Sequence, residues 1–410
     1  MKAKFNIFRI SLYLFLSIIL LNVNGILYLL GMSTGTISPI ILVLSIIILL
    51  ASLKQKSYLL YNMYIAYFLL YLGIGLISLG VSGKMGEKSL QTIIDITTTF
   101  IIVSASFFGI KKEICKYGNQ IIKYIGWLII ISVLISIFMD ITGVTHEIDR
   151  YRTDIRLSGI FANPNETSAQ ALFSIIFIKY LYSTRKNSFF MKTIYLILFI
   201  LSFYALFLAN SRVIIGIAIL LFLLSFLFYT KFSLKTLSIY TLLALAMLNV
   251  SENIYNNANI SLRKRIDNST TIFEKGITDE NSGGRIYLAN HALDMIYKNP
   301  FIGVGLGKMQ KMEDIGGAHN AYLAIWGNAG IVPLLFFLFF ISVLLLKLFK
   351  QSKYTLDNTF LFLILIIVIN GFSKTGVYEF KINNVILGLA IAMLSCPRPL
   401  KFRKKNQFRN

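Results

Sequence analysis

Two arginines and a histidine stand where polar parts of the chain meet its apolar stretches. Arg212 joins two apolar runs, Arg285 begins a short stretch with helical periodicity, and His319 precedes another apolar run. A guanidinium binds phosphate through paired hydrogen bonds. An imidazole with a pKa near neutrality can act as a general base. These residue types predict chemistry on an anionic, lipid-borne substrate at a membrane surface.

Three more arginines, Arg150, Arg152 and Arg156, lie together in one short polar segment. With Arg212 and Arg285 they could form a cationic funnel for phosphate. The segment ends in Asn163-Pro164-Asn165, a turn that predicts a helix start capped by Asn165 or Glu166.

Each of these residues also has a structural interpretation. Arg212 could snorkel to the membrane interface, and His319 could cap the helix that follows it. The run from Gly303 to Gly307 suggests a nucleotide-binding loop, but no βαβ unit surrounds it, so we predict a tight turn instead. No histidine, cysteine and carboxylate cluster has metal-ligand spacing, so we predict no metal and no cofactor.

The elements that position these residues are predicted to be membrane helices. Of the 410 residues, 56% are hydrophobic, compared with about 45–50% in soluble domains, and mean hydropathy is +0.71. Many apolar runs approach the roughly 20 residues that span a bilayer. We predict an all-α, polytopic integral membrane protein with about twelve transmembrane helices, at 8–30, 37–53, 58–80, 90–110, 121–142, 166–182, 190–209, 212–230, 234–250, 320–346, 358–373 and 382–396.

These spans divide the chain into six regions. We expect N-terminal transmembrane helices at 1–142, an outer loop at 143–165 and central transmembrane helices at 166–250. A large, partly helical extracytoplasmic loop at 251–319 carries the catalytic motifs. C-terminal transmembrane helices at 320–396 and a basic cytoplasmic tail at 397–410 follow it.

The charge distribution predicts the orientation. A formal net charge of +22 could indicate a nucleic-acid partner. More than half of the 40 basic residues, however, fall on one side of the predicted spans, as the positive-inside rule expects of the cytoplasmic side. We therefore predict no nucleic-acid partner, two cytoplasmic termini, and an extracytoplasmic active site on the bacterial cytoplasmic (inner) membrane.

The order of several short motifs resembles the O-antigen ligase/polymerase superfamily of membrane glycosyltransferases. The resemblance covers residues 150–340, and the motifs are Arg156-Leu157-Ser158-Gly159, Asn163-Pro164-Asn165, Ser211-Arg212, Gly284-Arg285, the stretch from Asn299 to Gly305, His319-Asn320-Ala321-Tyr322-Leu323 and Gly330-Ile331.

The resemblance implies roles for individual residues. Arg212 and Arg285 would hold the pyrophosphate of an undecaprenyl-pyrophosphate-linked glycan donor, and His319 would activate the acceptor hydroxyl. Arg156 would also bind substrate, and we add Arg152, Asn165 and Asn320 as substrate-binding candidates. The chain departs from many relatives, which have a glutamate at the position of Asn328 and a tryptophan shortly after the arginine corresponding to Arg285.

The expected activity is metal-independent, inverting polymerisation of lipid-linked repeat units into a capsule, exopolysaccharide or O-antigen. Expected partners are the lipid-linked glycan donor and acceptor, membrane lipids, and flippase and chain-length regulator proteins. A ligase that passes finished glycan to an acceptor is the alternative within the superfamily. A polysaccharide flippase is the alternative from another class, but it would place functional charges along a path across several helices.

Overall fold

The computed structural model of the chain describes most of the predicted membrane region. The described residues are 6–33, 35, 37–56, 58–82, 87–144, 156–161, 163–184, 188–228, 263, 267, 276, 278–282, 284–310, 312, 316–355 and 357–396. The predicted span at 234–250, the predicted tail at 397–410, Arg150 and Arg152 lie outside this set.

All regular elements of the described residues are helices, apart from a single β-bridge between Met312 and Gly316. The helices are α1 (Ile7–Leu20), α2 (Val23–Leu29), α3 (Ile37–Leu50), α4 (Leu59–Ser82), α5 (Glu87–Tyr117), α6 (Gln120–Ile141), α8 (Pro164–Ser183), α9 (Phe189–Leu208), α10 (Arg212–Phe228), α13 (Asp279–Ser282), α14 (Arg285–Lys298), α15 (Ala321–Ala329), α16 (Ile331–Thr355), α17 (Thr359–Asn370), the 3-10 helix η1 (Thr375–Tyr378) and α18 (Lys381–Ser395).

Several helices are long and apolar enough to cross a bilayer. Among the described residues α4, α5, α6, α9 and α16 qualify, and the bent pair α1–α2 makes a sixth. Four shorter apolar helices, α3, α10, α17 and α18, accompany them. The structure therefore supports an all-helical membrane protein with five or six candidate spans.

Two of the predicted spans are broken in the structure. The span predicted at 8–30 bends by 52° between α1 and α2, where Asn22 has a left-handed backbone (φ 47°). The span predicted at 320–346 is interrupted at Gly330, between α15 and α16. Hydropathy does not detect either break, because the flanking residues stay apolar on both sides.

The connections between helices sort into two groups. At one end, Arg9 forms an ion pair with Glu113 at 3.3 Å, and Lys112 Nζ donates to the Ala51 carbonyl at 2.8 Å. The Sγ of Cys396 donates there to the Lys111 carbonyl. These residues belong to the connections and chain ends that the charge pattern assigns to one side of the membrane.

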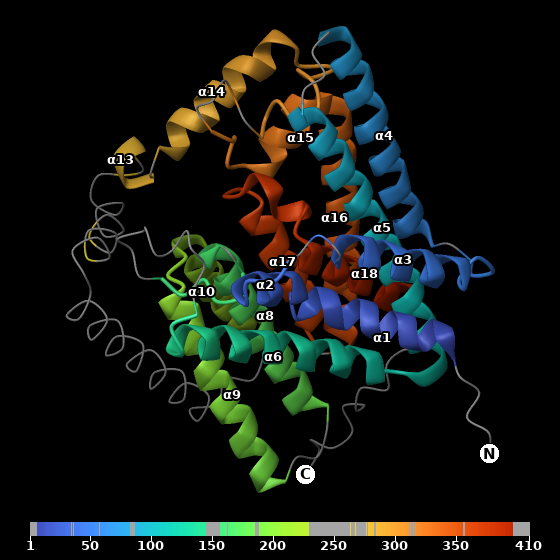
Figure 1. Cartoon of the computed structure of the whole chain (residues 1–410), viewed down its shortest axis with the longest axis vertical. Helices are drawn as coiled ribbons and strands as arrows, with labels where there is room; N and C mark the ends of the chain where they lie inside the picture. The colour runs from blue at the N-terminus through green and yellow to red at the C-terminus, as the bar shows by residue number, and fades with distance from the viewer. Residues whose placement is uncertain are drawn as a thin grey trace.

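A second group of described connections, those before α8, between α9 and α10, before α15 and between α17 and α18, meets at the site described below. The core between the two groups is built from α5, α8, α17 and α18. Figure 1 shows α17 and α18 in the middle of the molecule, with α9 at its periphery and α13–α14 extending along one edge. Most side chains of α8 and α18 are buried, which makes these helices a scaffold for the connections at their ends.

The glycine-rich stretch after α14 is a sequence of tight turns, as predicted. Gly303, Gly305 and Gly307 all have positive φ. The Val304 amide donates to the Gly327 carbonyl at 2.6 Å, and Ser78 Oγ donates to the Gly303 carbonyl at 2.8 Å. These bonds dock the turns on α15 and α4, so the chain that leads to His319 is held against the bundle.

The break at Gly330 requires glycine, and Gly330→Ala should lower stability by about 1–3 kcal/mol or more. Gly330 has φ 83° and ψ −179°, a region that only glycine populates readily. An added Cβ would also lie 1.9 Å from the Phe301 carbonyl oxygen. We expect a lower thermal unfolding midpoint of the detergent-purified protein, followed by tryptophan fluorescence.

Gly80→Ala is the matched control for this substitution. Gly80 lies inside α4 with ordinary φ, and no atom lies within 4 Å of an added Cβ. Equal midpoints for Gly330→Ala and Gly80→Ala would show that the break does not depend on glycine.

Candidate active site

A cavity of about 300 Å³ lies where several of the connections meet. Its lining comes from the start of α8, the α9–α10 turn, α14, the chain before α15, and the α17–α18 connection. The lining residues are Asn163, Asn165, Ser211, Val213, Arg285, Gln310, Gly317, His319, Asn370, Ser373, Lys374, Thr375 and Gly376. We call it the basic cavity, since its charged lining residues are cationic.

Arg285 reaches the cavity because α14 begins there. Helix α14 follows Gly284, which has φ 78° in the N-cap position. It packs on α15 through a small core that joins both helices to the glycine-rich turns, made of Ala292, Ile296, Met309, Met312, Ala318 and Ala324. Burial of this apolar stripe holds the polar loop, and Arg285 with it, against the membrane helices.

His319 is placed by the start of α15. Its backbone is left-handed, with φ 47°, which is uncommon for a residue other than glycine. Asn320 follows as the N-cap, and its Oδ1 accepts hydrogen bonds from the amides of Tyr322 at 2.9 Å and Leu323 at 3.1 Å. The Ala321 amide donates to the Gly371 carbonyl at 2.8 Å. The strained backbone is therefore fixed by the residues that follow it, and strained backbone of this kind occurs at many functional sites.

The environment of His319 favours its neutral form. Loss of surrounding water and the nearby positive charge of Arg285 lower the pKa of His319 below its usual value of 6.5. The imidazole keeps part of its surface exposed. At neutral pH it is thus an unprotonated base that faces the cavity and lies within the electrostatic reach of Arg285.

This lowered pKa predicts the pH dependence of the site. A reaction that needs neutral His319 should keep its rate down to a pH below 6.5 and slow as the His319 imidazole becomes protonated. In a variant with His319 as its single histidine (H146Q/H291Q), carbethoxylation by diethyl pyrocarbonate should show the same lowered midpoint. Adding Arg285→Gln should raise that midpoint toward 6.5. An unchanged midpoint would show that Arg285 does not act on His319.

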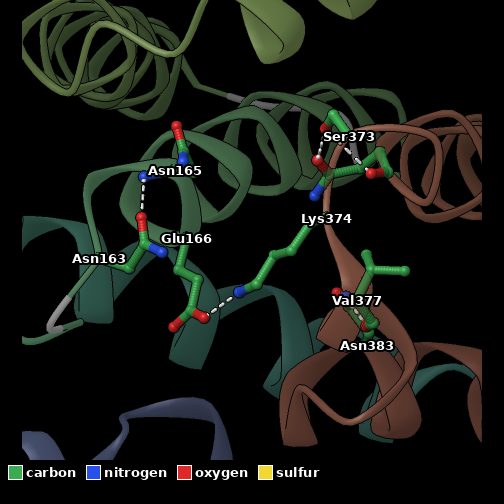
Figure 2. A network of polar contacts seen from close by, with 8 residues as sticks. Asn163, Asn165, Glu166, Ser373, Lys374, Val377 and Asn383 are labelled. Carbon is green, nitrogen blue, oxygen red and sulfur yellow. Dashed lines mark hydrogen bonds and ion pairs between the residues drawn. The ribbon is translucent and has the colours of Figure 1, made fainter. Parts of the chain in front are cut away.

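Lys374 contributes a second cation to the lining, and it comes from the connection between α17 and α18. Figure 2 shows its side chain reaching across to Glu166 in the first turn of α8, with which it forms an ion pair. Glu166 itself lines a different cavity, so the lysine and its partner form part of the wall between the two. Ser373 Oγ donates to the Asn370 side chain at 3.0 Å beside it.

The start of α8 corrects the predicted cap. Asn163 is the N-cap: its Oδ1 accepts from the Asn165 amide at 2.9 Å, as Figure 2 shows, and Pro164 follows it. Proline suits the first helical position because its missing N–H needs no partner there. Asn165 and Glu166 are therefore inside the helix, and the Asn165 side chain is available to line the cavity.

Two of the predicted arginines, Arg212 and Arg156, are not among the residues that line the basic cavity. Arg212 is the exposed first residue of α10, between the lining residues Ser211 and Val213. Arg156 precedes Leu157, whose amide donates to the Leu208 carbonyl at the end of α9 at 3.1 Å. Arg212 is thus at the rim of the basic cavity, at the turn where Asn210 has φ 44°.

Residues 197–338 match the family model described as O-antigen ligase. This match agrees with the resemblance of the motifs to the O-antigen ligase/polymerase superfamily. The matched segment contains Arg212, Arg285 and His319, and it ends within α16. No curated protein matches the chain.

The structure brings together only part of the predicted site. Arg285, His319 and Asn165 line one cavity, and Arg212 borders it. Asn320 is used as a helix cap, and Arg152 lies outside the described residues.

Sequence reasoning missed Lys374, Gln310, Asn163 and Ser373 as lining residues. The polar Ser373-Lys374-Thr375 run between two apolar spans was the available signal for two of them.

Asn328, at the position where many superfamily members have a glutamate, is buried in the scaffold. Its Oδ1 accepts from the Met309 amide at 3.3 Å, and its Nδ2 donates to Tyr71 at 3.2 Å and to Gln310 at 3.3 Å. These bonds hold the turn that carries Gln310 into the basic cavity.

A metal centre has no support in the part of the chain that the structure describes. No group of three or more histidine, cysteine and carboxylate residues within it is arranged to hold a metal ion.

Proposed function

We propose that the protein polymerises lipid-pyrophosphate-linked oligosaccharide repeat units into a surface polysaccharide, at the outer face of the bacterial cytoplasmic membrane. The observation that carries this proposal is the basic cavity, where Arg285, His319 and Lys374 face one space beside Arg212. The superfamily match supports a membrane glycosyltransferase of the ligase or polymerase type.

In the proposed step, an acceptor hydroxyl attacks the anomeric carbon of the donor sugar. The new bond joins the acceptor oxygen to that carbon, and the bond from the carbon to the pyrophosphate oxygen breaks. The hydroxyl proton passes to a nitrogen of neutral His319. The departing pyrophosphate takes the electron pair, and Arg285, Arg212 and Lys374 stabilise its charge without requiring a metal. A single displacement inverts the anomeric centre.

The proposal includes the membrane topology. With twelve spans and both termini in the cytoplasm, every connection that lines the basic cavity would face outward. That arrangement agrees with the gathering of these connections around one cavity and of the basic connections elsewhere.

The second candidate is ligation of a finished glycan to an acceptor, which the description of the matching family favours. The two reactions share the donor and differ in the acceptor. Purified protein should therefore be incubated, with chelator, with a synthetic lipid-pyrophosphate repeat unit. A ladder of longer glycans would establish a metal-independent polymerase.

Other outcomes would change the assignment. Transfer of a preformed polymer to an added acceptor, without a ladder, would establish a ligase. No product in either assay, together with movement of lipid-linked glycan across proteoliposome membranes, would show that the protein is a transporter and neither a polymerase nor a ligase.

A further inference from the structure

A second cavity of about 400 Å³ lies on the other side of the Lys374–Glu166 pair. It is bounded by α1, α2, the start of α3 and the start of α18. Most of its wall is apolar and includes Ile18, Ile37 and Ile41, while Glu166 and Glu379 are its acidic residues. Its volume is in the range of small-molecule sites, about 300–1,000 Å³.

The bend between α1 and α2 builds this cavity. Asn22 has a left-handed backbone, and its Nδ2 donates to the Ile160 carbonyl at 2.6 Å. Gly25 lies so close to the same carbonyl that an added Cβ would be 1.9 Å from its oxygen. The bend is therefore held against the chain before α8 by a hydrogen bond and a close backbone approach, and α2 diverges from α1 by 52°.

Two polar contacts link the two cavities. Lys374 lines the basic cavity and pairs with Glu166, which lines the second one. Gln310 lines the basic cavity and hydrogen-bonds to Glu379, which lines the second one. A group bound in the second cavity at these carboxylates would therefore be adjacent to a group bound beside His319.

The charged residues that line the two cavities differ. The charged residues lining the basic cavity are cations, which suits pyrophosphate, whereas the second cavity has two carboxylates and a single lysine, Lys381. Carboxylates repel pyrophosphate but accept hydrogen bonds from hydroxyl groups. Burial, and to a lesser extent Asp95, raises the pKa of Glu379 to about 7, so this carboxyl group can also donate a hydrogen bond near neutral pH.

We propose that the second cavity binds the hydroxyl-bearing sugar of the acceptor glycan, while the donor pyrophosphate occupies the basic cavity. This inference rests on the proposed glycosyl transfer. The carboxylates and Asn24 bind the sugar hydroxyls, and the apolar wall packs against its C–H faces. The acceptor hydroxyl then enters the reaction past the Lys374–Glu166 pair.

The test uses variants of α2, which provides walls to the second cavity but none to the basic one. Asn24→Ala and Tyr28→Ala change this wall. Tyr204→Ala on α9 is the matched control, because Tyr204 is 44% exposed and Tyr28 46%, and Tyr204 lines neither cavity. The acceptor probe is the free repeat-unit oligosaccharide, without lipid or phosphate, released from the host's own surface polysaccharide.

We expect Asn24→Ala and Tyr28→Ala to raise the KM for the free oligosaccharide at least tenfold. The KM for the lipid-pyrophosphate donor should change less than twofold, and Tyr204→Ala should match the wild type. Inorganic pyrophosphate should compete with the donor but not with the oligosaccharide. A raised KM for the donor, seen with a long isoprenoid and absent with a short one, would instead assign the cavity to the lipid and overturn the inference.

A direct binding measurement separates this inference from the proposed function. If wild-type protein transfers no sugar, saturation-transfer NMR with the free oligosaccharide still tests whether the second cavity binds glycan. If the two α2 variants lose this binding and Tyr204→Ala keeps it, the second cavity is a glycan site even though the proposed reaction is disproved. Absence of binding to the wild type would overturn the glycan site itself.

Discussion

Replacing His319 with alanine should lower the rate of glycan transfer by about 10²–10⁴-fold, the usual contribution of a general base. The imidazole lines the basic cavity and is neutral near pH 7, because Arg285 and desolvation lower its pKa. The lost interaction belongs to proton transfer, so kcat and kcat/KM should fall together while donor binding persists. Initial rates with a synthetic lipid-pyrophosphate donor would measure this.

His291→Gln is the control for this experiment, since His291 lies on α14 and does not line the basic cavity. It should keep nearly the wild-type rate. Thermal unfolding midpoints should show that His319→Ala is folded, as the amide contacts of Asn320 continue to hold the start of α15. A folded His319→Ala protein with a rate within tenfold of wild type would rule out His319 as the base.

Arg285→Ala should lower kcat/KM by about 10²–10³-fold, as expected when one group that stabilises developing charge is removed. Arg285 is the first residue of α14 and faces the basic cavity. Its guanidinium can bind two phosphate oxygens at once, which lysine cannot do. Arg285→Lys should therefore recover only part of the loss. Inhibition by inorganic pyrophosphate should be strongest in the wild type, weaker in Arg285→Lys and weakest in Arg285→Ala.

Lys298→Ala tests whether any lost charge on α14 has this effect. Lys298 lies at the opposite end of the helix, is exposed and does not line the cavity. Its removal should leave kcat/KM and pyrophosphate inhibition nearly unchanged. Equal losses for Lys298→Ala and Arg285→Ala would mean that only the overall charge of the loop matters.

Local sequence was informative wherever a property depends on neighbouring residues. Apolar composition predicts the membrane helices because a bilayer-spanning segment must satisfy its backbone internally and expose apolar side chains. Arg285 and His319 were predicted because an arginine suited to phosphate and a histidine suited to general-base catalysis stand where polar parts of the chain meet apolar runs. The turns at Gly303–Gly307 followed from the conformational freedom of glycine.

Asparagine roles were harder to predict, because an asparagine side chain serves equally well in a cap, a packed scaffold or a binding site. Asn320 caps α15 and Asn163 caps α8, while Asn165 lines the cavity. Asn328 holds the turn that carries Gln310. Only the positions of the neighbouring backbone amides distinguish these uses.

The amino-acid sequence is sufficient to predict the helical membrane class, the resemblance of the motifs to the superfamily, and three residues that line the basic cavity, Arg285, His319 and Asn165. The sequence does not show that Lys374 joins them, or that Lys374 pairs with Glu166, 208 residues away in the chain, between a cavity lined by cations and a cavity lined by two carboxylates. Side-chain periodicity records only which face of a helix is buried. Which helix ends meet depends on the packing of all the helices together.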